Sequence, residues 1–138
     1  MEYKHITNTE IKLSIPRKYE KIILCVARVA KPKRFDIFLE VASLLSDYAF
    51  IWIGNNEPIQ DTYENVFCLG SIPEAGKYNQ LVDLFMLPSD YEGLPMVIIE
   101  AMRYGKPVVA SNVGGISEIV VNGENGYTVE NDPIVFAE

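Results

Sequence analysis

Two glutamates, Glu92 and Glu100, stand eight residues apart on either side of a predicted helix start. Proline is tolerated in the first turn of a helix, so Pro95 predicts a start near Leu94 or Pro95, and Gly105 is typical of the helix end. Glu92 then lies in the preceding loop, and Glu100 lies about 7.5 Å along the helix axis from Pro95. The two carboxylates can therefore flank one ligand at different depths.

The chemistry of this pair suits a ligand that is both anionic and rich in hydroxyl groups. Backbone N–H groups at a helix start attract an anion, whereas two carboxylates repel an anion and accept hydrogen bonds from hydroxyls. A nucleotide sugar carries a diphosphate between two sets of hydroxyls. One glutamate can accept hydrogen bonds from its ribose and the other from its sugar, so the pattern favours a nucleotide-sugar site.

A diphosphate also requires cations, and the predicted first strand is followed by several. Arg28 comes directly after the apolar run of that strand, where a guanidinium can hold two phosphate oxygens, and Lys33 follows as a more flexible charge. The alternative for Lys31, Lys33 and Arg34 is a solvated basic loop before a helix.

Other phosphate and metal motifs are absent from the sequence. None of the nine glycines completes G-x-G-x-x-G, and the stretch 70–77 is one residue too long for a Walker loop. One histidine, two cysteines and no Asp-x-Asp at a strand end make no metal site, so we expect none. Cys25 and Cys68 lie in apolar runs and are expected to be buried thiols in a reducing cytosol.

Length and composition predict one soluble domain. The 138 residues are 49% hydrophobic and 22% charged, which is enough for a core without disulfide or metal support. The net charge of −7 argues against a nucleic-acid or anionic-lipid surface. The apolar runs are too short for a membrane helix and the first residues contain no signal peptide, so we expect a cytoplasmic location.

Apolar segments of two kinds alternate along the chain. Helical spacing of apolar residues occurs around 35–45, 78–85, 97–102 and 116–120. Strands alternating with helices predict an α/β fold, a doubly wound, Rossmann-like parallel sheet of about six strands with helices on both faces. In such folds ligands bind at the carboxyl ends of the strands. The predicted strands, rich in β-branched and aromatic residues, are 21–29, 48–54, 65–70, 84–89, 106–111 and 126–130.

The two ends of the chain differ from this pattern. Residues 1–20 have no clear period and are expected to be a linker or an excised edge, with the domain over 21–138. Asp132 and Pro133 are typical of a helix N-cap and first helical position. We therefore expect a final helix that is cut short.

Several segments, in order, resemble a known domain. They are VARVAKPKRFDIFLEVA, WIG, FCLG, PSDYEGLPMVIIEAMRYGKPVVAS, GGISEIV and NGENGYTV. Together, over about residues 21–132, they resemble the C-terminal nucleotide-sugar-binding domain of retaining glycosyltransferases of family 4, which have the GT-B fold. The most specific part is Glu92-x7-Glu100 within PS-x-x-EG-L-P and EAM-x-x-G-x-PVVAS.

This resemblance implies a role for each matching residue. Arg28 and Lys33 would hold the donor diphosphate, Glu100 the ribose hydroxyls, and Glu92 would approach the transferred sugar. Backbone amides around Gly93 and Leu94 would touch the sugar and phosphates.

The chain departs from the family pattern at two places. Many members have G-F-G where this chain has Gly93-Leu94-Pro95, and many have Gly where it has Arg34.

The sequence contains further candidate residues, most of which have both a functional and a structural interpretation. Gly114 and Gly115 either approach the donor or form a plain strand-to-helix turn. Glu118 matches the family's GG-x-x-E pattern and either contacts the donor or braces the loop. Trp52 is either core or a stacking platform. Gly70, within the stretch 69–73, is a candidate for base contacts.

The resemblance implies the donor half of a retaining hexosyltransferase that uses a UDP- or GDP-sugar without a metal or other cofactor. The acceptor, a glycan, a lipid-linked or a small molecule, would bind an N-terminal domain, through which any membrane contact would be made. The isolated domain would bind donor but scarcely turn it over.

Two alternatives remain at this point. A GT-B nucleotide-sugar epimerase would share the donor pocket, and a non-enzymatic α/β regulatory module is disfavoured because no acidic residue ends the first strand. Whether Glu92 is a nucleophile or an electrostatic stabiliser is left open.

Overall fold

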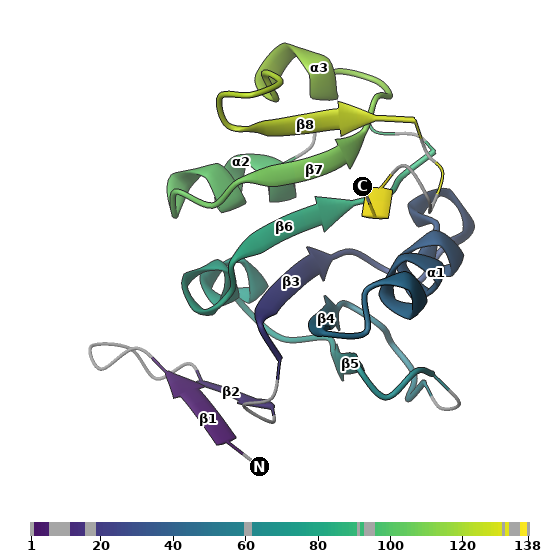
Figure 1. Ribbon diagram of the computed structural model, residues 1–138, viewed down its shortest axis with the longest axis vertical. Coiled ribbons are helices and arrows are strands. Elements are labelled where there is room, and N and C mark those ends of the chain that lie inside the picture. Colours follow the sequence, from purple (N-terminus) through teal and green to yellow (C-terminus); the bar gives the residue numbers. More distant parts are fainter. Residues whose placement is uncertain are drawn as a thin grey trace.

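The computed structural model describes residues 2–5, 12–15, 19–59, 62–90, 92, 96–130, 132 and 136–137. Its main sheet has six parallel strands in the order β5-β4-β3-β6-β7-β8 (Figure 1). The direction of winding reverses at β3, since β4 and β5 lie on one side of it and the later strands on the other. The strands are β3 (Lys21–Val26), β4 (Tyr48–Ile53), β5 (Val66–Gly70), β6 (Leu84–Leu87), β7 (Val108–Ser111) and β8 (Gly126–Val129).

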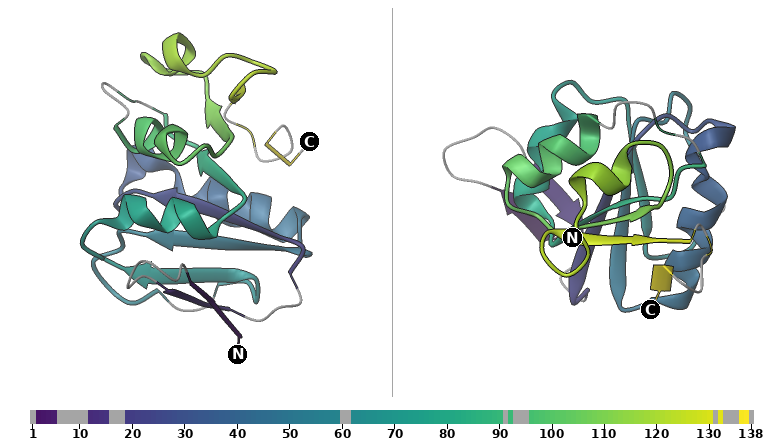
Figure 2. Two further views of the ribbon diagram at one scale, coloured as in Figure 1. Left: turned by 90° about the vertical axis from the view of Figure 1, so that its left-hand side faces the viewer. Right: turned by 90° about the horizontal axis from the view of Figure 1, so that it is seen from above.

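The helices lie on both faces of this sheet. In Figure 2, α1 lies against one face, and α2 and α3 lie against the other. This arrangement, with the strand order, confirms the predicted doubly wound, Rossmann-like α/β fold. The helices are α1 (Phe35–Leu44), α2 (Met96–Arg103) and α3 (Ile116–Ile119), with the 3-10 helices η1 (Lys31–Lys33) and η2 (Ala75–Leu81).

The predicted strands and helices are confirmed with one exception. Each predicted strand segment contains one observed strand, shortened at its ends. The helix predicted around 78–85 is instead η2, which ends at Leu81, and Phe85 belongs to β6. The physical reason is that Asp83 fastens the chain to β3: its N–H donates to the Ile22 carbonyl at 2.9 Å, and its Oδ2 accepts the Ile22 N–H at 2.8 Å.

Helix α2 ends close to where the sequence predicts. It ends at Arg103, and Gly105 follows at φ +73°, with its N–H donating to the Met102 carbonyl at 2.9 Å. A glycine in the left-handed region is a common helix terminator. Leu94 and Pro95, where the helix start is predicted, lie outside the described residues.

The ends of the chain contain additional elements. β1 (Glu2–His5) and β2 (Lys12–Ile15) form an antiparallel pair that is separate from the main sheet (Figure 1). At the other end, the Phe136 N–H donates to the Asp132 carbonyl at 3.0 Å, which is helical spacing, while Pro133 lies outside the described residues. The expectations of a linker and of a shortened final helix stay predictions.

An aromatic cluster forms the core between α1 and β4. The Phe38 ring lies edge-on to Phe50 and to Trp52, with centroid distances of 5.5 and 5.0 Å, and Phe35 lies 4.9 Å from Trp52. The Trp52 side chain is fully buried here. The structure therefore places Trp52 in the core and not on a ligand-stacking surface.

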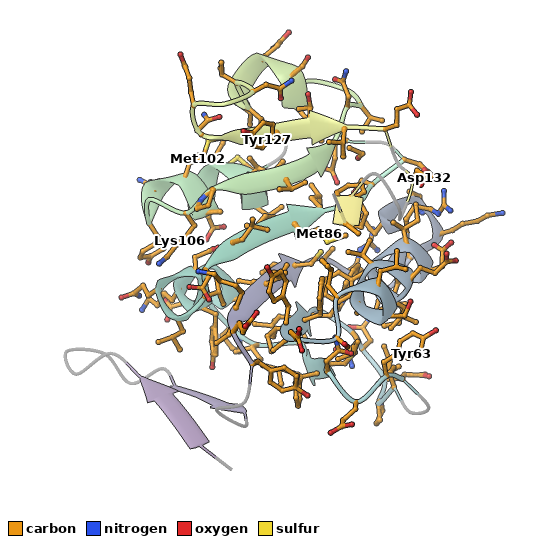
Figure 3. All side chains as sticks on the ribbon, in the orientation of Figure 1. Tyr63, Met86, Met102, Lys106, Tyr127 and Asp132 are labelled. Carbon is orange, nitrogen blue, oxygen red and sulfur yellow. The ribbon has the colours of Figure 1, made fainter. Side chains whose placement is uncertain are left out.

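A groove of about 760 Å³ lies on the α1 side of the sheet. It is lined mainly by apolar side chains, among them Met86 of β6 and Tyr127 of β8, both labelled in Figure 3. No candidate site residue lines it. The chemistry predicted from the sequence lies at the carboxyl ends of the strands instead.

The two cysteines are free thiols with different exposure. Cys25 is fully buried in central β3, and burial raises the pKa of its thiol well above the usual value. Cys68 is only partly buried, contrary to expectation, because β5 is an edge strand; its burial raises its pKa to about 11. Neither thiol is an effective nucleophile near neutral pH.

No helix in the described part of the chain is long and apolar enough to cross a membrane.

The aromatic cluster predicts a large stability effect at Phe38. We expect Phe38→Ala to lower the free energy of unfolding by about 3 to 5 kcal/mol, because it leaves a cavity between α1 and β4. Urea unfolding followed by tryptophan fluorescence measures this difference. Leu44→Ala, at an exposed position of the same helix, is the control and should change stability by less than about 1 kcal/mol. Equal effects of the two substitutions would contradict this account of the core.

Candidate functional site

Two loops meet where the strand order reverses. One follows β3 and contains η1, and the other follows β6. The Asp90 N–H donates to the Pro32 carbonyl at 2.7 Å, and the Arg34 guanidinium donates to both Asp90 carboxylate oxygens at 3.0 and 3.2 Å. These contacts join the two loops at the edge of the sheet where doubly wound folds bind ligands.

Lys33 and Glu92 form the third link between these loops. The Lys33 Nζ lies 2.5 Å from Glu92 Oε2, which also accepts the Ser89 hydroxyl at 2.9 Å. Ser89 is itself held from β7, because the Ser111 hydroxyl donates to the Ser89 carbonyl. The Glu92 side chain is 8% exposed and that of Lys33 is 26% exposed. The carboxylate is therefore fixed in a nearly dry position, with its charge balanced by one ammonium group.

Gly114 closes the site on the side of β7. Its φ of +54° lies in the left-handed region, and a Cβ built on it would overlap the Glu92 carbonyl oxygen. A side chain at this position would displace the Glu92 backbone. Gly114 thus approaches Glu92 directly, while Gly115 forms the turn that precedes α3.

Arg34 stands in a backbone conformation that favours glycine. Its φ is 54°, and non-glycine residues pay about 1 to 2 kcal/mol for this conformation. The side chain compensates by binding Asp36 through two hydrogen bonds, at 2.9 and 3.0 Å, in addition to Asp90. The guanidinium holds the pKa of the Asp36 carboxyl below its usual range. Glycine, which the resemblance implies for many members at this position, would adopt this conformation without steric cost, whereas Arg34 adopts it with its side chain held in ion pairs.

Arg28 and Lys31 differ from these paired cations. Both are exposed, and neither side chain makes a hydrogen bond or ion pair with any residue that the structure describes. The predicted solvated basic loop therefore describes Lys31 but not Lys33 or Arg34, which are engaged in ion pairs. Arg28, at the end of β3, is free to bind a ligand.

Glu100 has different neighbours from Glu92. It is half-buried on α2, and its carboxylate lies directly against Gly76 of η2, where a Cβ would overlap Oε2. The η2 segment belongs to the connection that leaves the carboxyl end of β5. The structure thus associates Glu100 with that connection and Glu92 with the loops after β3 and β6.

The remaining candidates are placed as follows. Gly70 has φ +86° at the end of β5; its N–H donates to Asn55 Oδ1 at 2.8 Å and its carbonyl accepts the Gly54 N–H at 2.8 Å. Glu118 is exposed on α3, and its side chain makes no hydrogen bond with the described part of the protein. Gly93 and Leu94 lie outside the described residues.

Sequence reasoning missed four contributors, Ser89, Asp90, Ser111 and Gly76. The two serines end the segments PS and VVAS, both within the quoted motif, but only the fold shows that the Ser111 hydroxyl donates to the Ser89 carbonyl. Asp90 lies inside the same motif, at one of its unspecified positions, and carries no further signal. No group of three or more His, Cys, Asp or Glu residues that could hold a metal ion occurs among the described residues.

Comparison with known proteins decides the family. A family model described as "Glycosyl transferases group 1" matches residues 20–138. The chain belongs to this family. This group 1 domain is 35% identical over 115 residues to the O-antigen biosynthesis glycosyltransferase WbnH of Escherichia coli, a match that covers 79% of this chain and 33% of WbnH. The resemblance identified from the sequence is confirmed at the level of the glycosyl transferases group 1 family.

Solved structures support the same assignment. Sucrose-phosphate synthase from Thermosynechococcus elongatus has a TM-score of 0.78 and 26% identity, over 89% of this chain and 35% of that one. A variant of TarM from S. aureus, solved with fondaparinux, alpha-GlcNAc-glycerol and UDP, has a TM-score of 0.72 and 26% identity, over 91% of this chain and 30% of that one. The group 1 domain has the Rossmann-like fold of its GT-B neighbours, and it spans about a third of the length of its curated relatives.

The buried ion pair predicts a non-additive effect on stability. Lys33→Met leaves the Glu92 carboxylate buried without its counter-charge, so we expect the free energy of unfolding to fall by about 1 to 3 kcal/mol. Adding Glu92→Gln removes the unpaired charge and should restore most of that loss. Urea unfolding of both single variants and the double variant measures the coupling.

Lys31→Met is the matched control, since Lys31 is exposed in the same loop, and it should change stability by no more than about 0.5 kcal/mol. Additive effects of the Lys33 and Glu92 substitutions would show that the two side chains are not coupled.

Proposed function

We propose that this domain binds the donor of a retaining glycosyltransferase of family 4, which transfers a hexose from a UDP- or GDP-sugar to a glycan, a lipid-linked or a small-molecule acceptor. The observation that carries the proposal is the junction at the sheet's switch point. There, Arg28, whose side chain has no ion-pair partner among the described residues, follows β3 beside a loop whose Lys33 is bonded to a nearly buried Glu92. Cations for a diphosphate and a carboxylate for sugar hydroxyls thus lie on adjoining loops.

The parts of the donor are assigned by their chemistry. The diphosphate lies between Arg28 and Lys33, the sugar near Glu92, and the ribose at Glu100 on the side of η2. The presence of UDP in the similar TarM structure supports this class of ligand. Two positive side chains can balance a diphosphate, so donor binding in this proposal requires no metal ion.

The Lys33 ammonium has enough hydrogen-bond donors to bind Glu92 and phosphate oxygens at the same time. Its ammonium has three N–H groups, of which one is directed at Glu92. The other two are available to phosphate oxygens. A donor therefore does not need to break the Lys33–Glu92 pair, and the pair holds the carboxylate in place while the diphosphate binds.

Glu92 is the catalytic residue of this proposal. Its carboxylate stabilises positive charge that develops at the anomeric carbon, or attacks that carbon as a nucleophile; both routes are compatible with retention. The acceptor and the rest of the catalytic groups come from an N-terminal domain, so the 138-residue chain binds donor without efficient turnover. The proposed location is the cytoplasm, with any membrane contact made through that second domain.

Ligand-dependent thermal stability tests the binding function. UDP, GDP and their sugars should raise the melting temperature of this domain, since a ligand at 100 times its Kd adds about 2.7 kcal/mol of stability. Failure of every uridine and guanosine diphosphate to stabilise the domain would contradict the proposal. In the full-length protein, conversion of free donor without transfer to an acceptor would identify an epimerase instead.

Arg28 should contribute specifically to diphosphate affinity. We expect Arg28→Ala to weaken binding of UDP or GDP by about 1.5 to 3 kcal/mol, the scale of charge-assisted hydrogen bonds, and to leave nucleoside binding unchanged. Isothermal titration calorimetry with the nucleoside diphosphate and the nucleoside separates the two. Lys31→Ala, another exposed cation of the same loop, should have a much smaller effect. Equal losses for both ligands would remove Arg28 from the phosphate site.

A further inference from the structure

We infer that Gly76 of η2 is a positioning residue that sets the Glu100 carboxylate and thereby determines discrimination between ribose and 2′-deoxyribose nucleotides. This inference rests on the proposed function, in which Glu100 accepts hydrogen bonds from the ribose. It concerns Gly76, which lies on a different element and 24 positions earlier in the chain, and which acts on Glu100 through its lack of a side chain.

The contact between the two residues is direct. A Cβ built on Gly76 would overlap Glu100 Oε2 and would lie 2.7 Å from Cδ and 3.4 Å from Oε1. The carboxylate therefore fills the space that a methyl group would occupy. Gly76 is buried and Glu100 is half-buried, so the carboxylate lies between α2 and η2 on a residue that is partly open to solvent.

The backbone does not require glycine at this position. Gly76 is not among the residues with positive φ, and it lies inside a 3-10 helix, where alanine is favoured over glycine in free energy. A glycine in such a position is expected to have a packing reason. The three heavy atoms outside η2 that lie nearest the missing Cβ all belong to the Glu100 carboxylate.

The η2 segment is braced internally and is anchored in the core at its end, which limits how far its backbone can move away from Glu100. The buried Asn79 donates from Nδ2 to the Gly76 carbonyl at 2.9 Å, and Leu81 anchors the end of η2 in the core. The Glu100 carboxylate, by contrast, is the far end of a flexible side chain. An added methyl group at position 76 therefore displaces the carboxylate and leaves the fold intact.

The displacement has a specific consequence for ligand binding. A carboxylate oxygen accepts a hydroxyl hydrogen bond only within about 2.5 to 3.0 Å and with good alignment. A shift of the carboxylate by the width of a methyl group breaks its bonds to the ribose hydroxyls, while the diphosphate contacts of Arg28 and Lys33 are unchanged. Affinity for a ribonucleotide falls, and affinity for the 2′-deoxyribonucleotide does not.

The test is a double-mutant cycle read by nucleotide preference. Calorimetric titration with UDP and 2′-deoxy-UDP, and with GDP and 2′-deoxy-GDP, is carried out on the native domain, Gly76→Ala, Glu100→Ala and the double variant. We expect the native domain to prefer the ribonucleotide of the base it binds by about ten-fold or more, the scale of one to two hydrogen bonds to a charged group. Each single variant should reduce this preference to less than about three-fold, and the double variant should reduce it no further.

A control variant and three contrary results separate the role of Gly76 from the proposed function. Lys77→Ala, which alters the next residue of η2 and its ion pair with Glu74, should retain the native preference. A native preference that Glu100→Ala removes and Gly76→Ala retains would overturn the role of Gly76 but not the proposed function. Independent, additive losses of ribonucleotide preference in the double variant would also overturn the role of Gly76. If the native domain binds none of the four nucleotides, the proposed function itself fails.

A folding defect would also be informative. If Gly76→Ala lowers stability, Glu100→Ala in the same chain should restore it, because the overlap is with the Glu100 side chain alone. Urea unfolding of the two variants decides this point. Failure of Glu100→Ala to restore stability would show that Gly76 serves the packing of η2 and not the position of Glu100.

Discussion

The pairing of β6 with β3 is the constraint on which the whole site depends. Strand β6 follows β5 in the chain, yet it crosses the sheet to lie beside β3, and Asp83 starts this pairing through both its N–H and its carboxylate. Two loops that are about sixty residues apart in sequence therefore leave the sheet side by side. The ion pairs between them, and the approach of Gly114 from the next strand, all follow from that adjacency.

The fold was largely predictable from the sequence, because short apolar runs and helical spacing report burial along each segment separately. The 3-10 helix η2 was not, since its end is set by a hydrogen bond from Asp83 to a distant strand. The pairing of Lys33 with Glu92 and the contact of Glu100 with Gly76 could likewise not be predicted from the sequence pattern. Both are contacts between different elements, and residue type and spacing within one element carry no information about them.

The electrostatics of the site combine an acidic chain with a local excess of cations. Four of the twelve basic residues lie within the seven positions 28–34. Two of these, Lys33 and Arg34, are balanced by carboxylates, so the positive charge offered to solvent there is smaller than the sequence indicates. The paired cations join this loop to the loop after β6, whereas the side chains of Arg28 and Lys31 have no ion-pair partner among the described residues; in the proposed function it is Arg28 that contributes affinity for the diphosphate.

The left-handed backbone of Arg34 has a consequence for how this loop can change over evolutionary time. Glycine meets the conformation at no steric cost, whereas arginine meets it here with its guanidinium bound by the carboxylates of Asp36 and Asp90. An exchange of glycine for arginine is thus favourable only after at least one acidic partner is present. The order of substitutions is constrained, and the acidic positions that accompany a non-glycine residue here should vary together with it among related sequences.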